Sequence, residues 1–467
     1  MESCEYQTSK GADCLESNAC VPEDGVRAAH RVMTTRPELV RSLGRWSLAG
    51  LVLNGIIGSS VFFLPGPLAD RLGWMSLAAW AIAAGCCAAM ILCFAEVASR
   101  FSGAGGAYLF TRTAFGAFTG LQVGWLSYFV RAITAAVQAN LFSTYLAEFW
   151  PWAATRLGGI AATTLFIGVL AGANIRSVVS GARLSNGFAL VKTMPLLLFG
   201  VLGLMWLAGG KAVPAPLPSD PSLSGWLGVL LLLMFAYGGF ESAVIPLGEA
   251  TDPRRDAPVA LLGGLGIAAF VYILAQVTVL ATLSEPAAST RPLADSARAM
   301  LGNTGATIIT LAALISVYGW LASNLLTVPR LSMAMAERGD FPAFFARVHP
   351  AYRTPHLSIL FFAAISWALA NQAGLLQNLS LAAVSRLFTY GLVCAALPVL
   401  RRRDRLGTSE LSPALFRAPW GNVLAAFSVL VSITLASRMN LREAVSLAIT
   451  VALATMYWFF SRREPGK

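Results

Sequence analysis

Two glycine-rich stretches interrupt long apolar segments of this sequence, and each could present backbone polar groups to a ligand. The first is residues 54–62 (NGIIGSSVF), and the second is residues 235–242 (FAYGGFES). Glycine disfavours regular helix, and in lipid an unwound turn persists only where it lines a cavity or is buried in protein. Freed N–H groups attract a carboxylate, and freed carbonyls attract an ammonium group or a cation. Together the two stretches could therefore bind a zwitterion without any charged side chain.

Each stretch alone could also serve close packing between helices, because small residues are common at such contacts. The spacing of the two breaks along the chain favours a role in substrate binding. The two breaks fall in the first and sixth apolar segments, so the two halves of the chain would cross the membrane in opposite directions. That is the arrangement of an inverted repeat, in which substrate binds where two interrupted helices meet.

Four charged residues lie well inside apolar segments, where each costs roughly 2.5–3.5 kcal/mol on insertion scales. Lys192 could release a proton when buried, or its ammonium could snorkel to the inner surface. Arg131 could face the substrate pocket and favour an acidic side chain, or it could pair with Glu241 or a carbonyl. We interpret Arg386 as structural. Glu241 directly follows the second break and is a candidate for gating or proton movement.

The composition indicates that these groups belong to a membrane protein. Of 467 residues, 56% are hydrophobic and only 12% are charged, whereas soluble domains carry about 25% charged residues. The net charge of +11 does not indicate nucleic-acid binding, because the basic residues concentrate in short loops between apolar segments, as membrane topology requires. The lipid bilayer is the expected partner.

A bilayer core of about 30 Å requires roughly 20 apolar residues per helix, and the sequence predicts twelve such spans. The predicted spans are 46–66, 74–97, 107–147, 159–174, 185–208, 224–248, 261–284, 303–334, 357–374, 378–400, 420–437 and 441–461. The third and eighth are too long for one crossing, so each should include an interfacial stretch. If the N-terminus is inside, most of the 34 lysines and arginines, including the cluster Arg401–Arg403, fall on the inner side. We therefore expect both termini to be cytoplasmic and the protein to lie in the inner (plasma) membrane.

Several motifs resemble those of the amino acid–polyamine–organocation permeases, from about Arg45 to the twelfth span. They are residues 55–62 (GIIGSSVF), 102–108 (SGAGGAY), 240–258 (from Phe240-Glu241 to EATDPRRDAP) and 329–355 (from Pro329-Arg330 through ERGDFP to Thr354-Pro355). The family usually has Gly-Ser-Gly where this chain has Gly58-Ser59-Ser60. Because Ser60 carries a Cβ, a substrate carboxylate has less room to approach there.

The resemblance implies an all-α membrane protein with twelve transmembrane helices and a LeuT-type 5+5 inverted repeat, with helices 1 and 6 broken. The polar, aperiodic residues 1–44 are interpreted as a disordered cytoplasmic tail, followed by a transport domain (45–461) and a cytoplasmic C-terminus (462–467). The transport domain would comprise repeat 1 (about 45–208), repeat 2 (about 224–400) and two appended helices (about 420–461). The tail could begin at Met33 instead of Met1.

The resemblance also implies roles for individual residues. Backbone N–H groups of Gly58, Ser59 and Ser60 would hold a substrate carboxylate. Carbonyls near Ile56, Phe235 and Gly238 would hold its amine. Phe235 would be an aromatic gate, and Trp320 would line the outer part of the pocket. Lys192 would stand where sodium-coupled relatives bind a cation.

The expected activity is secondary active transport of amino acids by alternating access, proton-coupled or exchanging and independent of sodium. A carrier of polyamines or other organic amines, and a substrate sensor on the same scaffold, are the alternatives. The sequence contains no metal-ligand spacing and no nucleophile–base pair, so we expect no cofactor, no metal and no catalytic residue. An amino acid and protons are the expected small partners, and the oligomeric state is not indicated.

Overall fold

A computed structural model describes residues 45–101, 106–176, 181–214, 217–241, 253–408 and 411–461, and every regular element in these ranges is a helix. The predicted tail (1–44) and C-terminus (462–467) lie outside the described residues. The same holds for 102–105 and 242–252, which contain parts of two of the motifs above.

The described helices overlap the predicted apolar segments. Their bounds are α2 (Arg45–Ile56), α3 (Ser60–Phe63), α4 (Pro65–Leu72), α5 (Ser76–Ala98), α6 (Gly106–Phe115), α7 (Ala117–Leu146), α8 (Arg156–Arg176), α9 (Gly181–Ala208), α10 (Leu223–Ala236), α12 (Pro253–Thr282), α13 (Pro292–Glu337), α14 (His356–Gln372), α15 (Leu375–Arg405), α16 (Gly421–Ala436) and α17 (Leu441–Ser461). In addition, the short 3-10 helices are η1 (Gly73–Met75), η2 (Pro151–Ala154), η4 (Pro286–Ala288) and η5 (Ala343–Ala346). Among the described residues, seven helical stretches are long and apolar enough to cross a membrane, and three further apolar helices are shorter.

A glycine divides the first of the two segments that were too long for one crossing, and another lies just before the second. Gly116, with φ +96°, separates α6 from α7. Gly302, with φ +66°, interrupts α13 just before residue 303. Both values lie in the left-handed region that glycine adopts without steric cost. The run 107–147 therefore becomes two helices, whereas 303–334 stays within the part of α13 that follows the kink.

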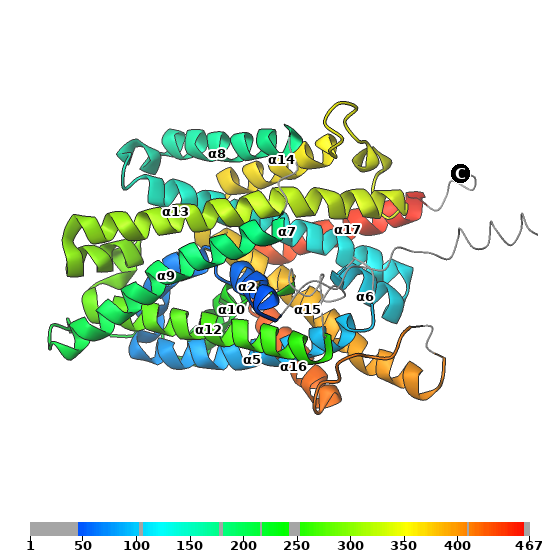
Figure 1. Cartoon of the computed structure of the whole chain (residues 1–467), viewed down its shortest axis with the longest axis horizontal. Coiled ribbons are helices and arrows are strands. Elements are labelled where there is room, and N and C mark those ends of the chain that lie inside the picture. Colours follow the sequence, from blue (N-terminus) through cyan, green and yellow to red (C-terminus); the bar gives the residue numbers. More distant parts are fainter. Residues whose placement is uncertain are drawn as a thin grey trace, which may run out of the picture. The chain divides into compact units, whose positions relative to one another are not determined.

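The described helices pack around α7, α12 and α15. Helix α12 contacts α2, α5 and α9, and α7 contacts α6, α13, α14 and α15. Figure 1 shows α14 beside α8 and α12 beside α5, and both pairs are in contact. Large apolar side chains such as Leu165, Leu430 and Phe460 point outward with about two thirds of their surface exposed. Such a surface suits lipid and not water.

Buried ion pairs tie the end of α5 to the end of α15. Arg401 donates to both carboxylate oxygens of Glu96, at 2.7 and 2.5 Å, and Arg100 lies 2.5 Å from Asp404. The backbone N–H of Ala418 also donates to Glu96 at 2.7 Å. Glu96 is fully buried, so this network fixes the segment before α16 to the helix bundle.

Candidate functional site

Two helical interruptions meet in the middle of the described helices. Helix α2 ends at Ile56 and α3 begins at Ser60, while α10 ends at Ala236 and residues 237–240 form turns. A Cβ added to Gly55 would lie 2.5 Å from the carbonyl oxygen of Gly239. Gly239 has φ +110°, and a Cβ there would overlap the Gly55 carbonyl. The two backbones therefore touch at a contact that only glycine allows on either side.

Tyrosine and glutamine side chains satisfy carbonyls on both interruptions. The hydroxyl of Tyr272, in α12, lies 2.9 Å from the carbonyl oxygen of Ile56 and 3.3 Å from that of Ala236. A hydroxyl donates one hydrogen, so the two carbonyls share it. Gln276, one turn further along α12, donates to the carbonyl of Pro65 at 3.1 Å. Helix α12 therefore connects the two broken helices.

Lys192, in α9, places its ammonium on the end of α2. Nζ donates to the carbonyl of Asn54 at 2.9 Å and also to that of Ile57. The side chain is 1% exposed, so it does not snorkel to a membrane surface. The C-terminal end of a helix carries partial negative charge, and the ammonium occupies that end in the way a bound cation would.

The other side of the first interruption faces α7 and α13. A Cβ on Gly58 would lie 3.1 Å from Nε2 of Gln138 and 3.8 Å from the Trp320 ring. Ser316 Oγ lies 3.5 Å from the Gly58 carbonyl. The hydroxyl of Ser59 and the side-chain oxygen of Gln138 are buried and have no hydrogen-bond partner among the described residues. Buried polar atoms are normally satisfied, so a ligand or water is expected there.

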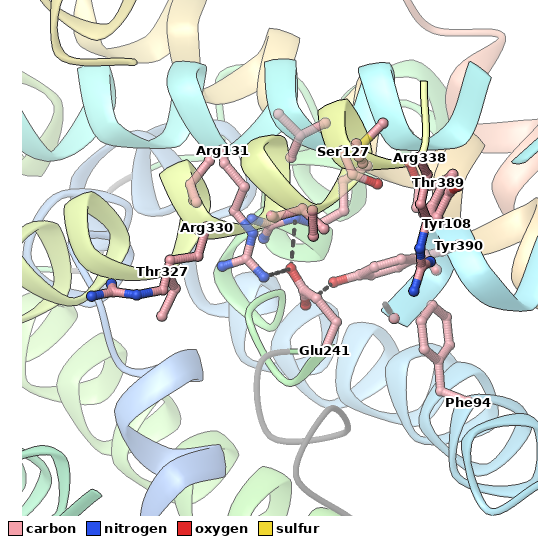
Figure 2. Close-up of a pocket in the computed structure, with 18 residues that line it drawn as sticks. Phe94, Tyr108, Ser127, Arg131, Glu241, Thr327, Arg330, Arg338, Thr389 and Tyr390 are labelled. Carbon is pink, nitrogen blue, oxygen red and sulfur yellow. Dashed lines mark hydrogen bonds and ion pairs between the residues drawn. The ribbon is translucent and has the colours of Figure 1, made fainter. Parts of the chain in front are cut away.

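Glu241 lies directly after the second interruption, and its carboxylate accepts a hydrogen bond from the backbone of that interruption. Its Oε2 accepts hydrogen bonds from the Gly239 N–H at 2.8 Å and from the Tyr390 hydroxyl at 2.6 Å. Its Oε1 lies 3.5 Å from Arg131 and 4.0 Å from Arg386. Figure 2 shows the carboxylate between Arg131 and Tyr390. Of the two interpretations of Arg131, this geometry matches pairing with Glu241; Asn324, on α13, is a second partner at 3.3 Å.

Arg386, in α15, contacts the same interruption. Its guanidinium donates to the carbonyl of Phe235 at 3.3 Å and to the Thr134 hydroxyl at 3.4 Å. It lies 5.3 Å from the centre of the Phe235 ring, within reach of a cation–π contact. A Cβ on Gly238 would overlap the guanidinium. The absence of a side chain at Gly238 thus makes room for Arg386.

A cavity of about 330 Å³ opens beside these groups. It reaches from Glu241 and Arg386 to Tyr108 in α6 and Arg338 at the end of α13 (Figure 2). Its volume is within the range of small-molecule sites, about 300–1,000 Å³. A small ligand could therefore reach the second interruption through it.

The structure brings the sequence-predicted residues together around the two interruptions. The first interruption contains Ile56, Gly58, Ser59 and Ser60, and the second contains or adjoins Phe235, Gly238 and Glu241. Trp320 and Lys192 lie against the first interruption, and Arg131 pairs with Glu241 beside the second. The carbonyls of Ile56 and Phe235 already accept hydrogen bonds from Tyr272 and Arg386, so an amine could use only their remaining lone pairs.

Sequence reasoning missed Gln138, Tyr272 and Tyr390 and gave Arg386 only a structural role. The charge of Arg386 inside a span was a usable signal. A polar residue in mid-span was the signal for Gln138. Tyrosines in apolar segments are common, and nothing in the sequence distinguished Tyr272 or Tyr390.

Comparison with known proteins assigns the chain to a family. A family model described as "Amino acid permease" matches residues 43–460. The chain belongs to the amino acid permease family. It is 28% identical to the serine/threonine exchanger SteT of Bacillus subtilis, over 91% of this chain and 98% of SteT. It is 29% identical to cationic amino acid transporter 4 of Mus musculus, over 78% of this chain and 60% of the mouse protein. An uncharacterized transporter of Mycobacterium tuberculosis, MT2055, is 28% identical over 77% of this chain and 80% of its own length.

This membership accounts for the helix pattern. The permease is a multi-pass membrane protein, and the matched family and relatives are transporters and not enzymes.

Proposed function

We propose that this permease moves amino acids across the inner membrane by alternating access, binding them where the two helical interruptions meet. The observation that carries the proposal is the backbone contact between Gly55 and Gly239, which brings two broken helices together. Interrupted helices at such a junction offer N–H groups to a carboxylate and carbonyls to an amine. SteT and the mouse transporter, whose names state amino acid substrates, support the same class of cargo.

In this proposal, twelve helices cross the membrane, ten of them as two inverted repeats, and both termini are cytoplasmic. The N–H groups at Gly58, Ser59 and Ser60 hold the substrate carboxylate, because the first turn of a helix leaves such donors without intrahelical partners. Carbonyls near Ile56, Phe235 and Gly238 hold the amine. Phe235 and Trp320 close over the substrate.

The cavity beside Glu241 is the inner vestibule in this account. It extends toward Arg338, on a segment that the distribution of basic residues assigns to the cytoplasmic side. Glu241 and its partners Arg131 and Tyr390 line the vestibule where it meets the second interruption. Their rearrangement would admit or release substrate.

Lys192 takes the role of a fixed cation in this mechanism. Its ammonium uses the carbonyls of Asn54 and Ile57, so a sodium ion would find those ligands occupied and meet a like charge. Loss of the Lys192 proton would remove its positive charge, weaken both hydrogen bonds and loosen the end of α2. Transport would then depend on protons or on exchange, and not on sodium.

Uptake into proteoliposomes tests the proposal. Purified protein is reconstituted, and a panel of radiolabelled amino acids is applied with sodium or choline outside, with and without an inward proton gradient, and with unlabelled amino acid inside. We expect saturable uptake of at least one amino acid, unaffected by sodium and stimulated by the gradient or by internal substrate. If folded protein takes up no amino acid, the proposed function is wrong, and an organic amine carrier or a sensor replaces it.

A further inference from the structure

Among the described residues, positive charge exceeds negative charge in the cavity beside the helical junction. The described lining of the cavity contains four guanidinium groups and one carboxylate, that of Glu241. The four arginines are Arg131, Arg330, Arg338 and Arg386. The ammonium of Lys192 lies on the far side of the first interruption. From the described lining, a ligand that enters this cavity meets net positive charge inside a medium of low dielectric, where charge–charge energies are several times those in water.

Arg386 has hydrogen-bonding capacity left for a ligand. It is 4% exposed, and its Nε–H has no hydrogen-bond partner among the described residues. The nearest carboxylate oxygen, on Glu241, is 4.0 Å from Nε, whereas charge-assisted hydrogen bonds measure about 2.7–2.9 Å. A buried arginine with an unsatisfied donor is costly, and an incoming carboxylate would satisfy it.

The position of Arg386 suits one end of a short ligand whose other end lies at the first interruption. Arg386 donates to Thr134, and Gln138, one turn further along the same face of α7, lies against Gly58. One helical turn is about 5.4 Å. That is comparable to the separation of the two carboxylates in a short dicarboxylic amino acid.

Resting on the function proposed above, we propose that the substrate is an acidic amino acid whose side-chain carboxylate binds the guanidinium of Arg386. Its main-chain carboxylate occupies the first interruption beside Gly58 and Gln138. A ligand with one net negative charge offsets part of the positive charge of the site. A basic amino acid would add a like charge there, so the same arrangement excludes it.

Competition for uptake tests this assignment. The uptake of radiolabelled aspartate by reconstituted protein is to be measured in the presence of unlabelled aspartate, glutamate, asparagine, serine, arginine or succinate. Aspartate and asparagine have nearly the same shape and differ in charge. We expect aspartate or glutamate to compete at least tenfold better than asparagine, and arginine and succinate not to compete.

Substitutions assign the preference to one residue. Arg386→Gln should remove most of the preference for aspartate over asparagine, and Arg386→Lys should retain part of it. Arg438→Gln is the matched control and should leave the preference unchanged. Arg438 is an exposed arginine before α17 that contacts Ser224. If Arg386→Gln does not fold, thermal unfolding of the wild type with each amino acid still tests the preference, because a bound ligand raises the unfolding temperature.

The outcomes separate this inference from the proposed function. Uptake of serine or arginine without uptake of acidic amino acids overturns the inference and leaves amino acid transport in place. Competition by succinate equal to that by aspartate also overturns it, because the ligand then needs no amine. Absence of uptake and of ligand stabilisation with every amino acid overturns the proposed function itself.

Discussion

Replacing Gly55 with alanine should weaken substrate binding more than it weakens the fold. The added Cβ would lie 2.5 Å from the Gly239 carbonyl oxygen and 3.1 Å from its carbon, whereas ordinary contacts begin at 3.4 Å. Both atoms belong to the backbone, so the two interruptions must separate by about 0.9 Å, the difference between 3.4 and 2.5 Å. Overpacking of this kind costs about 1–3 kcal/mol.

That strain falls on the junction that holds the substrate, so affinity should fall by about 5- to 150-fold. Overall stability should change less, because alanine in a helix is about 1 kcal/mol better than glycine. Gly263→Ala is the matched control: it lies in α12, and a Cβ there meets nothing within 4 Å. Uptake kinetics and thermal unfolding of both variants give the comparison. If Gly55→Ala has wild-type affinity while folded, the junction is not the substrate site.

Three further substitutions test separate parts of the account. Lys192→Ala should abolish stimulation of uptake by a proton gradient; stimulation that persists in this variant would remove Lys192 from coupling. Tyr272→Phe leaves the carbonyls of Ile56 and Ala236 without their shared donor and should lower the free energy of unfolding by about 1–2 kcal/mol, measured by denaturant titration in detergent; an unchanged value would contradict the bridging role. Glu96→Gln removes the carboxylate that pairs with Arg401 and should cost about 1.5–3 kcal/mol, measured as a lower unfolding temperature. An unchanged unfolding temperature would contradict the role of Glu96 in stability.

The positions of the helices could be predicted because lipid imposes a simple rule on the sequence. A span needs a long apolar run, and the bounds of α16 and α17 fall within one residue of the predicted segments 420–437 and 441–461. The helix ends at Ile56 and Ala236 likewise coincide with glycine-rich stretches. These features are local, so the residues that determine them are neighbours in the sequence.

The partners of the site residues could not be predicted in the same way. Lys192 bonds to the carbonyl of Asn54 from 138 residues away, and Arg386 bonds to that of Phe235 from 151 residues away. Each contact depends on how α9 or α15 is rotated about its axis. The packing of many side chains determines that rotation, so it cannot be predicted from the apolar pattern of a single helix.

The most direct test is an experimental density map of the purified permease with a transported amino acid bound. The account predicts ligand density at the junction, with the main-chain carboxylate within hydrogen-bonding distance of the N–H groups at Gly58–Ser60 and the side chain toward Arg386. Density confined to the vestibule near Arg338, with the junction filled only by protein side chains, would contradict it.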